Sequence, residues 1–208
     1  SMTDHSEHTT AFQWWHIQQI ADLHYVPGKF VTLFGFEWTS ARYGHKNVIY
    51  PDRGGPIFSS LVKGTDTPTG LWKALEGYRA ITIPHHPADT SMATDWRFRN
   101  DKFQRLVEIF QACRASYEYD GCPRQHANAT RKGCFVQDAL NMGHRLGIIA
   151  STDHGYGASY AAVFAPELTR DAIFNALYDR RCYGSTAMGI FVDFRADGHF
   201  MGEEYTTD

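Results

Sequence analysis

The chain has 208 residues, of which 43% are hydrophobic, 21% charged and 14% aromatic, and its formal net charge is −3. This composition is typical of a globular domain and excludes disordered, collagen-like and coiled-coil chains. The charge provides no global attraction for nucleic acid or an anionic membrane, and no apolar run reaches the roughly 18 residues of a membrane span. We therefore expect one domain over residues 3–208, after a cloning remnant at residues 1–2, that acts on a small molecule.

The cysteines and histidines indicate which kinds of site the protein contains. The four cysteines, Cys113, Cys122, Cys134 and Cys182, form no CxxC pair and are interpreted as reduced thiols. The compartment stays open, with the cytoplasm slightly favoured, and the oligomeric state is not indicated. The eleven histidines stand out, because histidine is the commonest metal ligand and titrates near neutral pH.

Apolar periodicity and turn residues predict an alternation of helices and strands. The expected helices span residues 10–24, 68–77, 134–142 and 169–178, and the expected strands span residues 30–39, 47–50, 80–83, 106–111, 146–150, 161–165 and 190–195. Residues 52–69 are rich in Gly, Pro and Ser and are expected to form a long loop. The alternation predicts parallel βαβ units, and hence an α/β barrel or a layered sheet.

Metal-ligating residue types occur where the predicted strands end. Four clusters share this position: Asp4-His5, Glu37, His85-His86 and Asp153-His154. In α/β barrels this edge holds the active site, because the loops that leave the strands converge there. Imidazole and carboxylate ligands suit Zn²⁺, Mn²⁺ or Fe²⁺ better than Ca²⁺ or Mg²⁺, which prefer oxygen ligands. The pattern predicts a divalent metal site.

The two strongest clusters also have simpler interpretations. Glu37 lies in an apolar strand, where a buried carboxylate needs a cation unless the side chain reaches solvent at the strand end. His85 and His86 would form an exposed turn between two prolines. Because adjacent side chains diverge in extended backbone, only one of the two histidines is expected to be a ligand, and His85 is favoured.

The other candidates keep their alternatives as well. Asp153 and His154 would cap the next helix or form an Asx turn, and Asp4-His5 would be unstructured near the terminus. His45 follows Glu37 closely and fits a substrate contact and an ordinary loop residue equally well. The remaining histidines are expected to be surface or helix-capping residues.

Five segments resemble the PHP (polymerase and histidinol phosphatase) superfamily, and more closely a bacterial branch of it labelled a domain of unknown function. They are TDHSE at residues 3–7, FGFEWTS with GHKNVIY over 34–50, TIPHHPA at 82–88, VEIFQ and SYE over 107–118, and GIIASTDHGYG at 147–157. The run over residues 180–204 resembles the same branch. Each motif alone is a weak signal, whereas five in the superfamily's order are a strong one.

The resemblance implies a distorted (β/α)₇ barrel with up to three metal ions, used mostly to hydrolyse phosphoesters. It implies that His5 is a ligand, that Glu37 bridges two ions, and that His85 or His86 is a further ligand. Asp153 and His154 would close the site, although the superfamily has Asp-x-His where these two residues are adjacent.

The front of the superfamily pattern, a strand that ends in His-x-His followed by another ligand histidine, is absent. We therefore expect a barrel that is incomplete at its N-terminal strands, because the chain is a fragment, because the site has decayed, or because another polypeptide completes it. A catalytic zinc normally has three protein ligands and one open position. Of one to three expected Zn, Mn or Fe ions, a remnant site on Glu37, His85, Asp153 and His5 would bind one or two.

These observations predict a metal-dependent hydrolase that cleaves a small phosphoester with metal-activated water. Glu37, Asp153 and His45 are the expected catalytic residues. A second hypothesis is a non-catalytic metal-binding or interaction domain, since part of the metal site is missing. A third is metal-dependent hydrolysis of carbon–nitrogen bonds, as in amidohydrolases. The net charge disfavours a nucleic-acid substrate.

Overall fold

A computed structural model describes residues 1–126, 130–155 and 157–207. A short 3₁₀ helix, Ser6–His8, precedes the helices α1 (Ala11–Leu23), α2 (Pro68–Ala74), α3 (Val136–Asn141) and α4 (Arg170–Tyr178). The longer strands are β1 (Phe34–Trp38), β2 (Lys46–Tyr50), β3 (Ile81–Pro84), β4 (Leu106–Gln111), β6 (Gly147–Ser151), β7 (Tyr160–Val163) and β8 (Cys182–Ser185). Three two-residue strands complete the set: β5 (Ala115–Ser116), β9 (Arg195–Ala196) and β10 (His199–Phe200).

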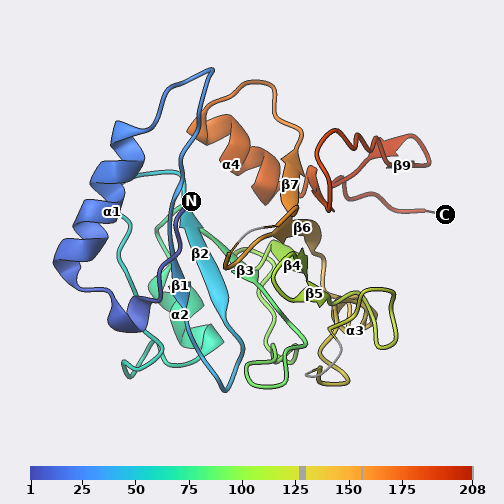
Figure 1. Cartoon of the computed structure of the whole chain (residues 1–208), viewed down its shortest axis with the longest axis horizontal. Helices are drawn as coiled ribbons and strands as arrows, with labels where there is room; N and C mark the ends of the chain where they lie inside the picture. The colour runs from blue at the N-terminus through green and yellow to red at the C-terminus, as the bar shows by residue number, and fades with distance from the viewer. Residues whose placement is uncertain (127–129, 156, 208) are drawn as a thin grey trace.

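The strands form several small sheets. Antiparallel pairing joins β1 to β2 and β2 to β3, and a second sheet has the order β5-β4-β6. A third sheet pairs β7 with β8, and β9 pairs with β10 near the C-terminus. Because β3 lies beside β4 and β6 lies beside β8, the first three sheets follow one another across the molecule. Figure 1 shows α1 on one side of them and the segment with β9 projecting from the opposite side.

The prediction of a (β/α)₇ barrel is wrong, because the sheets are small and mostly antiparallel and do not close into a barrel. The connection between β1 and β2, residues 39–45, is shorter than the dozen or so residues that a parallel crossover needs, so β2 returns antiparallel. Among the named strands of the described residues, only β4 and β6 pair in parallel, with α3 between them in the chain. The expected βαβ alternation therefore holds for a single unit.

Most predicted elements are present, with shifted ends. The helix expected over residues 169–178 is α4, which Thr169 caps by accepting a hydrogen bond from the backbone N–H of Ala172. The strand expected over residues 106–111 is β4. The strand expected over residues 190–195 is wrong, since residues 190–194 form no strand and leave Phe191 and Phe194 exposed. Only the short β9–β10 hairpin follows it.

Apolar packing fixes the position of β1, which carries Glu37. All five residues of β1 are buried, so this strand is covered on both faces. Trp38 and Phe36 pack in a cluster with Trp14 of α1 and Trp72 of α2. Burying side chains of this size contributes about 1.5–3 kcal/mol each, so the strand that carries Glu37 is rigidly held. Within the described residues, no helix combines the length and the hydrophobicity that a membrane span requires.

Candidate metal centre

Four of the predicted site residues meet at one point. Glu37, His45, His85 and His86 are all buried, and each offers a potential ligand atom, with these atoms within 4.8 Å of one another. Nδ1 of His45 lies 2.6 Å and Nε2 of His85 lies 3.4 Å from the same carboxylate oxygen, Oε1 of Glu37. This group, hereafter the His/Glu cluster, can hold a metal ion because its donors converge within the reach of one cation.

The β1–β2 hairpin places His45 beside Glu37. His45 immediately precedes β2, whose Asn47 is the register partner of Glu37. Gly44 makes the turn with a φ of 81°, and a Cβ atom there would lie 2.6 Å from the Cα of Thr94. Only glycine accommodates both the left-handed backbone and this close approach, so Gly44 fixes the direction in which His45 enters the site.

His85 and His86 both face the cluster, contrary to the expectation that adjacent side chains diverge. That expectation assumed extended backbone, whereas His86 has a φ of 39°. The two ring centroids are 4.0 Å apart. A non-glycine residue in this region of the backbone is strained, and such strain is commonly found at functional sites.

The protonation states in the cluster suit a cation. Burial by itself would raise the pKa of Glu37, but contacts with His45 and His85 hold that pKa well below its ordinary value. Burial, reinforced by the nearby charges of His85 and His45, lowers the pKa of His86. An ionised carboxylate and a neutral imidazole are the forms that bind metal.

Two nitrogen atoms of the cluster lack a hydrogen bond. Nδ1 of His86 and Nε2 of His85 are buried and make no hydrogen bond to any described residue, although Nε2 of His85 lies 3.4 Å from Oε1 of Glu37. An unpaired buried polar atom costs about 1–3 kcal/mol. A cation bound to these nitrogens would remove that cost, so the residues present fit a metal ion.

His5 lies at the margin of the cluster. Its Nδ1 atom is 3.4 Å from Oε1 of Glu37 and 2.6 Å from the hydroxyl of Thr39. A backbone hydrogen bond from the N–H of Glu37 to the carbonyl of Asp4 holds this segment parallel to β1. The His5 side chain is 41% exposed, so it forms the solvent side of the centre.

Asp153 and His154 stand apart from the four-residue group. Oδ1 of Asp153 lies 4.0 Å from Nδ1 of His85, but its Oδ2 atom accepts a hydrogen bond from the guanidinium of Arg114. Nε2 of His154 lies 3.7 Å from Oδ1 of Asp153. The His154 side chain is 69% exposed, so His154 lies outside the buried centre. Asp153 also has a positive φ, 57°, as His86 does.

Gln111 and Arg114 adjoin the cluster, although neither is of a metal-ligating residue type. Nε2 of Gln111 lies 3.2 Å from Nδ1 of His85, and Oε1 of the same amide accepts a hydrogen bond of 2.9 Å from Arg114. Both residues lie at the end of a strand, as the predicted site residues do: Gln111 is the last residue of β4, and Arg114 lies three positions after it. A search for strand-end His, Asp and Glu does not find them, whereas one that includes amide and guanidinium side chains does.

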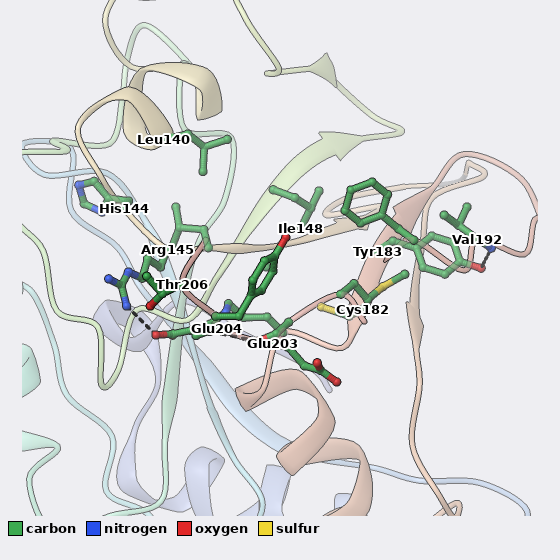
Figure 2. A pocket seen from close by; sticks show the side chains of 17 residues that line it. Leu140, His144, Arg145, Ile148, Cys182, Tyr183, Val192, Glu203, Glu204 and Thr206 are labelled. Carbon is green, nitrogen blue, oxygen red and sulfur yellow. Dashed lines mark hydrogen bonds and ion pairs between the residues drawn. The ribbon is translucent and has the colours of Figure 1, made fainter. Parts of the chain in front are cut away.

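A pocket of about 800 Å³ lies away from the His/Glu cluster, between β6, β8 and the C-terminal segment. Figure 2 shows its lining, in which Arg145 and Glu204 point toward each other and form an ion pair of 2.5 Å. Arg180 pairs with the same carboxylate at 2.6 Å. The second carboxylate of the lining, that of Glu203, lies 3.0 Å from Nδ1 of His199. Because the pocket contains no residue of the His/Glu cluster, it is not assigned as the metal centre.

Comparison with known families places the chain in one of them. Residues 1–120 match the family described as "Protein of unknown function (DUF3604)". The match covers more than half of the 208 residues, so the chain belongs to this family. The matched range includes Glu37, His45, His85 and His86, the whole of the His/Glu cluster.

Similar curated proteins occur in Chlamydia. Uncharacterized proteins of Chlamydia muridarum and Chlamydia trachomatis are each 27% identical over 156 residues, covering 66% of this chain and 25% of theirs. An uncharacterized protein of Chlamydia pneumoniae is 24% identical over 200 residues, covering 86% of this chain and 32% of its own. The chain thus spans about a quarter to a third of these relatives. No solved structure matches the chain.

Proposed function

We propose that this chain carries the metal centre of a hydrolase, with phosphoesters as its substrates. The observation that carries the proposal is the buried convergence of one carboxylate and three imidazoles within 4.8 Å, two of whose nitrogens make no hydrogen bond to any described residue. A carboxylate and imidazoles suit Zn²⁺, Mn²⁺ or Fe²⁺. When bound, such a cation supplies Lewis-acid chemistry, which activates water and neutralises charge that develops on a phosphoryl group.

The residues around the centre have separate proposed roles in attracting the cation, orienting its carboxylate ligand and admitting substrate. Glu37 provides the negative charge that attracts the cation, and His45 holds this carboxylate in place through the 2.6 Å contact. His5, on the solvent side, lines a pocket of about 400 Å³ together with His8 and His16. We propose this pocket as the entrance for substrate, because His5 lies both on its wall and 3.4 Å from Oε1 of Glu37.

The sequence motifs support this proposal even though the chain does not form a barrel. The segments that resemble the PHP superfamily contain Glu37, His45, His85 and His86, and that superfamily is used mostly for phosphoester hydrolysis. We propose the same relationship here on the motifs and the site. The relatives are three to four times longer than the part that the chain matches, so the activity of a whole protein of this kind belongs to the proposal as well.

The test is removal and return of metal. The protein is stripped with a chelator, and hydrolysis of p-nitrophenyl phosphate and its bis ester is measured before and after addition of Mn²⁺ or Zn²⁺. We expect activity to disappear and return with the metal, and Glu37→Gln to lose both bound metal and activity. The control is Glu76→Gln, which removes an exposed carboxylate at the end of α2.

Three other outcomes would contradict the proposal in different ways. Phosphoester hydrolysis that survives complete metal removal would exclude the metal mechanism. Stoichiometric metal without hydrolysis of any phosphoester would favour a non-catalytic metal-binding domain. Hydrolysis of amides in place of phosphoesters would leave the metal role intact and change the substrate class.

A further inference from the structure

Arg114 joins three segments beside the His/Glu cluster. Its guanidinium Nη1 donates to the Asp153 carboxylate and, at 2.9 Å, to Oε1 of Gln111. Its Nε atom lies 3.7 Å from Oδ2 of Asp89. The side chain is therefore held from both sides by carboxylates that come from different loops, and its position is fixed before any ligand binds.

Two side chains, those of Gln111 and Asp153, each lie between the Arg114 guanidinium and His85 of the cluster. Gln111, which accepts from Arg114, lies 3.2 Å from Nδ1 of His85. Asp153, which also accepts from Arg114, lies 4.0 Å from the same nitrogen. Two of the three partners of Arg114 thus lie next to a potential ligand of the metal ion.

Asp153 needs a positive charge, and Arg114 provides it. The Asp153 side chain is only 9% exposed, and a nearly buried carboxylate is strongly unfavourable without a cationic partner. Among the described residues, the group of three or more potential ligands that meet closely enough for one ion does not include Asp153. A second ion at Asp153 would have to displace the guanidinium from its two acceptors.

Arg114 also keeps donors for another anion. A guanidinium has five N–H donors in one plane, and Nη2 of Arg114 makes no hydrogen bond to any described residue. The side chain as a whole is 21% exposed, so Arg114 is not sealed off from solvent. Planar paired donors match two oxygens of a phosphate or carboxylate.

We propose that the Arg114 guanidinium takes the place of a second metal ion: the chain binds one divalent ion at the His/Glu cluster, and Arg114 binds the anionic group of the substrate beside it. This inference rests on the proposed function and makes it specific, since a single ion and a fixed arginine would share the charge of a phosphoryl group. Arginine is well suited to this task because it stays charged at every working pH.

The stoichiometry of the unmodified protein is the first test. The purified chain is loaded with excess Zn²⁺ or Mn²⁺, desalted and measured by elemental analysis. One ion per chain is expected, and two or three ions per chain would overturn the proposal while leaving a metal-dependent hydrolase possible. A chain that binds no ion would instead overturn the proposed function, and this inference with it.

The second test is the affinity of the metal-loaded protein for inorganic phosphate, measured by calorimetry. Arg114→Met should weaken phosphate binding at least tenfold, and Arg114→Lys, which keeps the charge, should weaken it less. In both variants the first ion should stay at the cluster, since Arg114 does not belong to it. Phosphate affinity unchanged in Arg114→Met would overturn the role of the guanidinium.

A matched control separates this effect from the loss of any paired arginine. Arg97 forms an ion pair of 2.7 Å with Asp95, but its side chain is 82% exposed and lies outside the centre. Arg97→Met should change neither metal content nor phosphate affinity. If Arg114→Met does not fold, the stoichiometry of the unmodified chain and the Arg114→Lys variant still decide the proposal.

Discussion

Nδ1 of His45 lies 2.6 Å from Oε1 of Glu37, and both side chains are almost completely buried. The contact joins the end of β1 to the residue that precedes β2, so it depends on the antiparallel return of the chain. A charged carboxylate in an apolar strand is thereby paired with an imidazole and aimed at two further histidines.

His45→Ala is expected to weaken metal binding. The variant removes one of the four potential ligands and also the side chain that orients Glu37. Removing even an outer partner of a metal ligand typically costs 10–100-fold in affinity, so a loss of at least about tenfold is expected. Competition against a chromophoric chelator measures it. His199→Ala, at an exposed position in β10, should match the parent protein, and equal affinities of all three proteins would exclude His45 from the centre.

Gly44→Ala is expected to damage both stability and metal binding. The new Cβ would meet the Thr94 backbone at 2.6 Å, in addition to the strain of a φ of 81°. Gly121→Ala is the matched control, since Gly121 has a φ of 88° but open space around it. Backbone strain alone should cost about 1–2 kcal/mol in both variants, and the collision should add about 1–3 kcal/mol in Gly44→Ala. Urea unfolding measures the difference, and equal losses in the two variants would contradict the close approach.

Glu108→Gln is expected to stabilise the metal-free protein at neutral pH. Burial raises the pKa of the Glu108 carboxyl, although the charge of His85 and a hydrogen bond from Ser151 act in the opposite direction. Above the ordinary pKa of 4.5 the unfolded chain releases this proton and the folded chain retains it, so stability falls as the pH rises.

Glutamine carries no titrating group, so the variant should lose that decline and be more stable by about 1.4 kcal/mol for each unit of raised pKa. Denaturant unfolding between pH 4 and pH 8, with a chelator present, provides the measurement. Glu76→Gln, at an exposed position, should keep the parental pH dependence. A parental slope in Glu108→Gln would mean that Glu108 is ionised in the folded protein.

Thiol labelling should separate the cysteines by burial. Burial raises the pKa of the Cys182 thiol to about 12, with a smaller opposing effect from Arg180, whereas Cys113 is exposed. At pH 8 a thiol with that pKa is ionised in only about one molecule in ten thousand, and the thiolate is the form that reacts. Iodoacetamide should therefore modify Cys113 first and Cys182 last, as followed by mass spectrometry. In denaturant the two should react at similar rates, and early modification of Cys182 in the folded protein would contradict its burial.

The sequence by itself determined the local features. Thr67 and Thr169 accept hydrogen bonds from the backbone N–H groups of Gly70 and Ala172 and so cap α2 and α4. These caps, the strand over residues 106–111 and the carboxylate within an apolar strand all follow from neighbouring residues, because capping and side-chain alternation act over a few positions. The positions of Glu37 and of the His85-His86 pair near the ends of strands could be predicted from the sequence for the same reason.

Only the tertiary structure decided how these pieces meet. The short loop over residues 39–45 returns β2 antiparallel, so no barrel closes, and the turn at Gly44 brings His45 into the cluster. The backbone of His86 leaves the extended region, and Arg114 pairs with Asp153 across 39 positions of the chain. The closure of the sheets, backbone strain and ion pairs of this kind result from packing between distant segments, which a local pattern of residues does not encode.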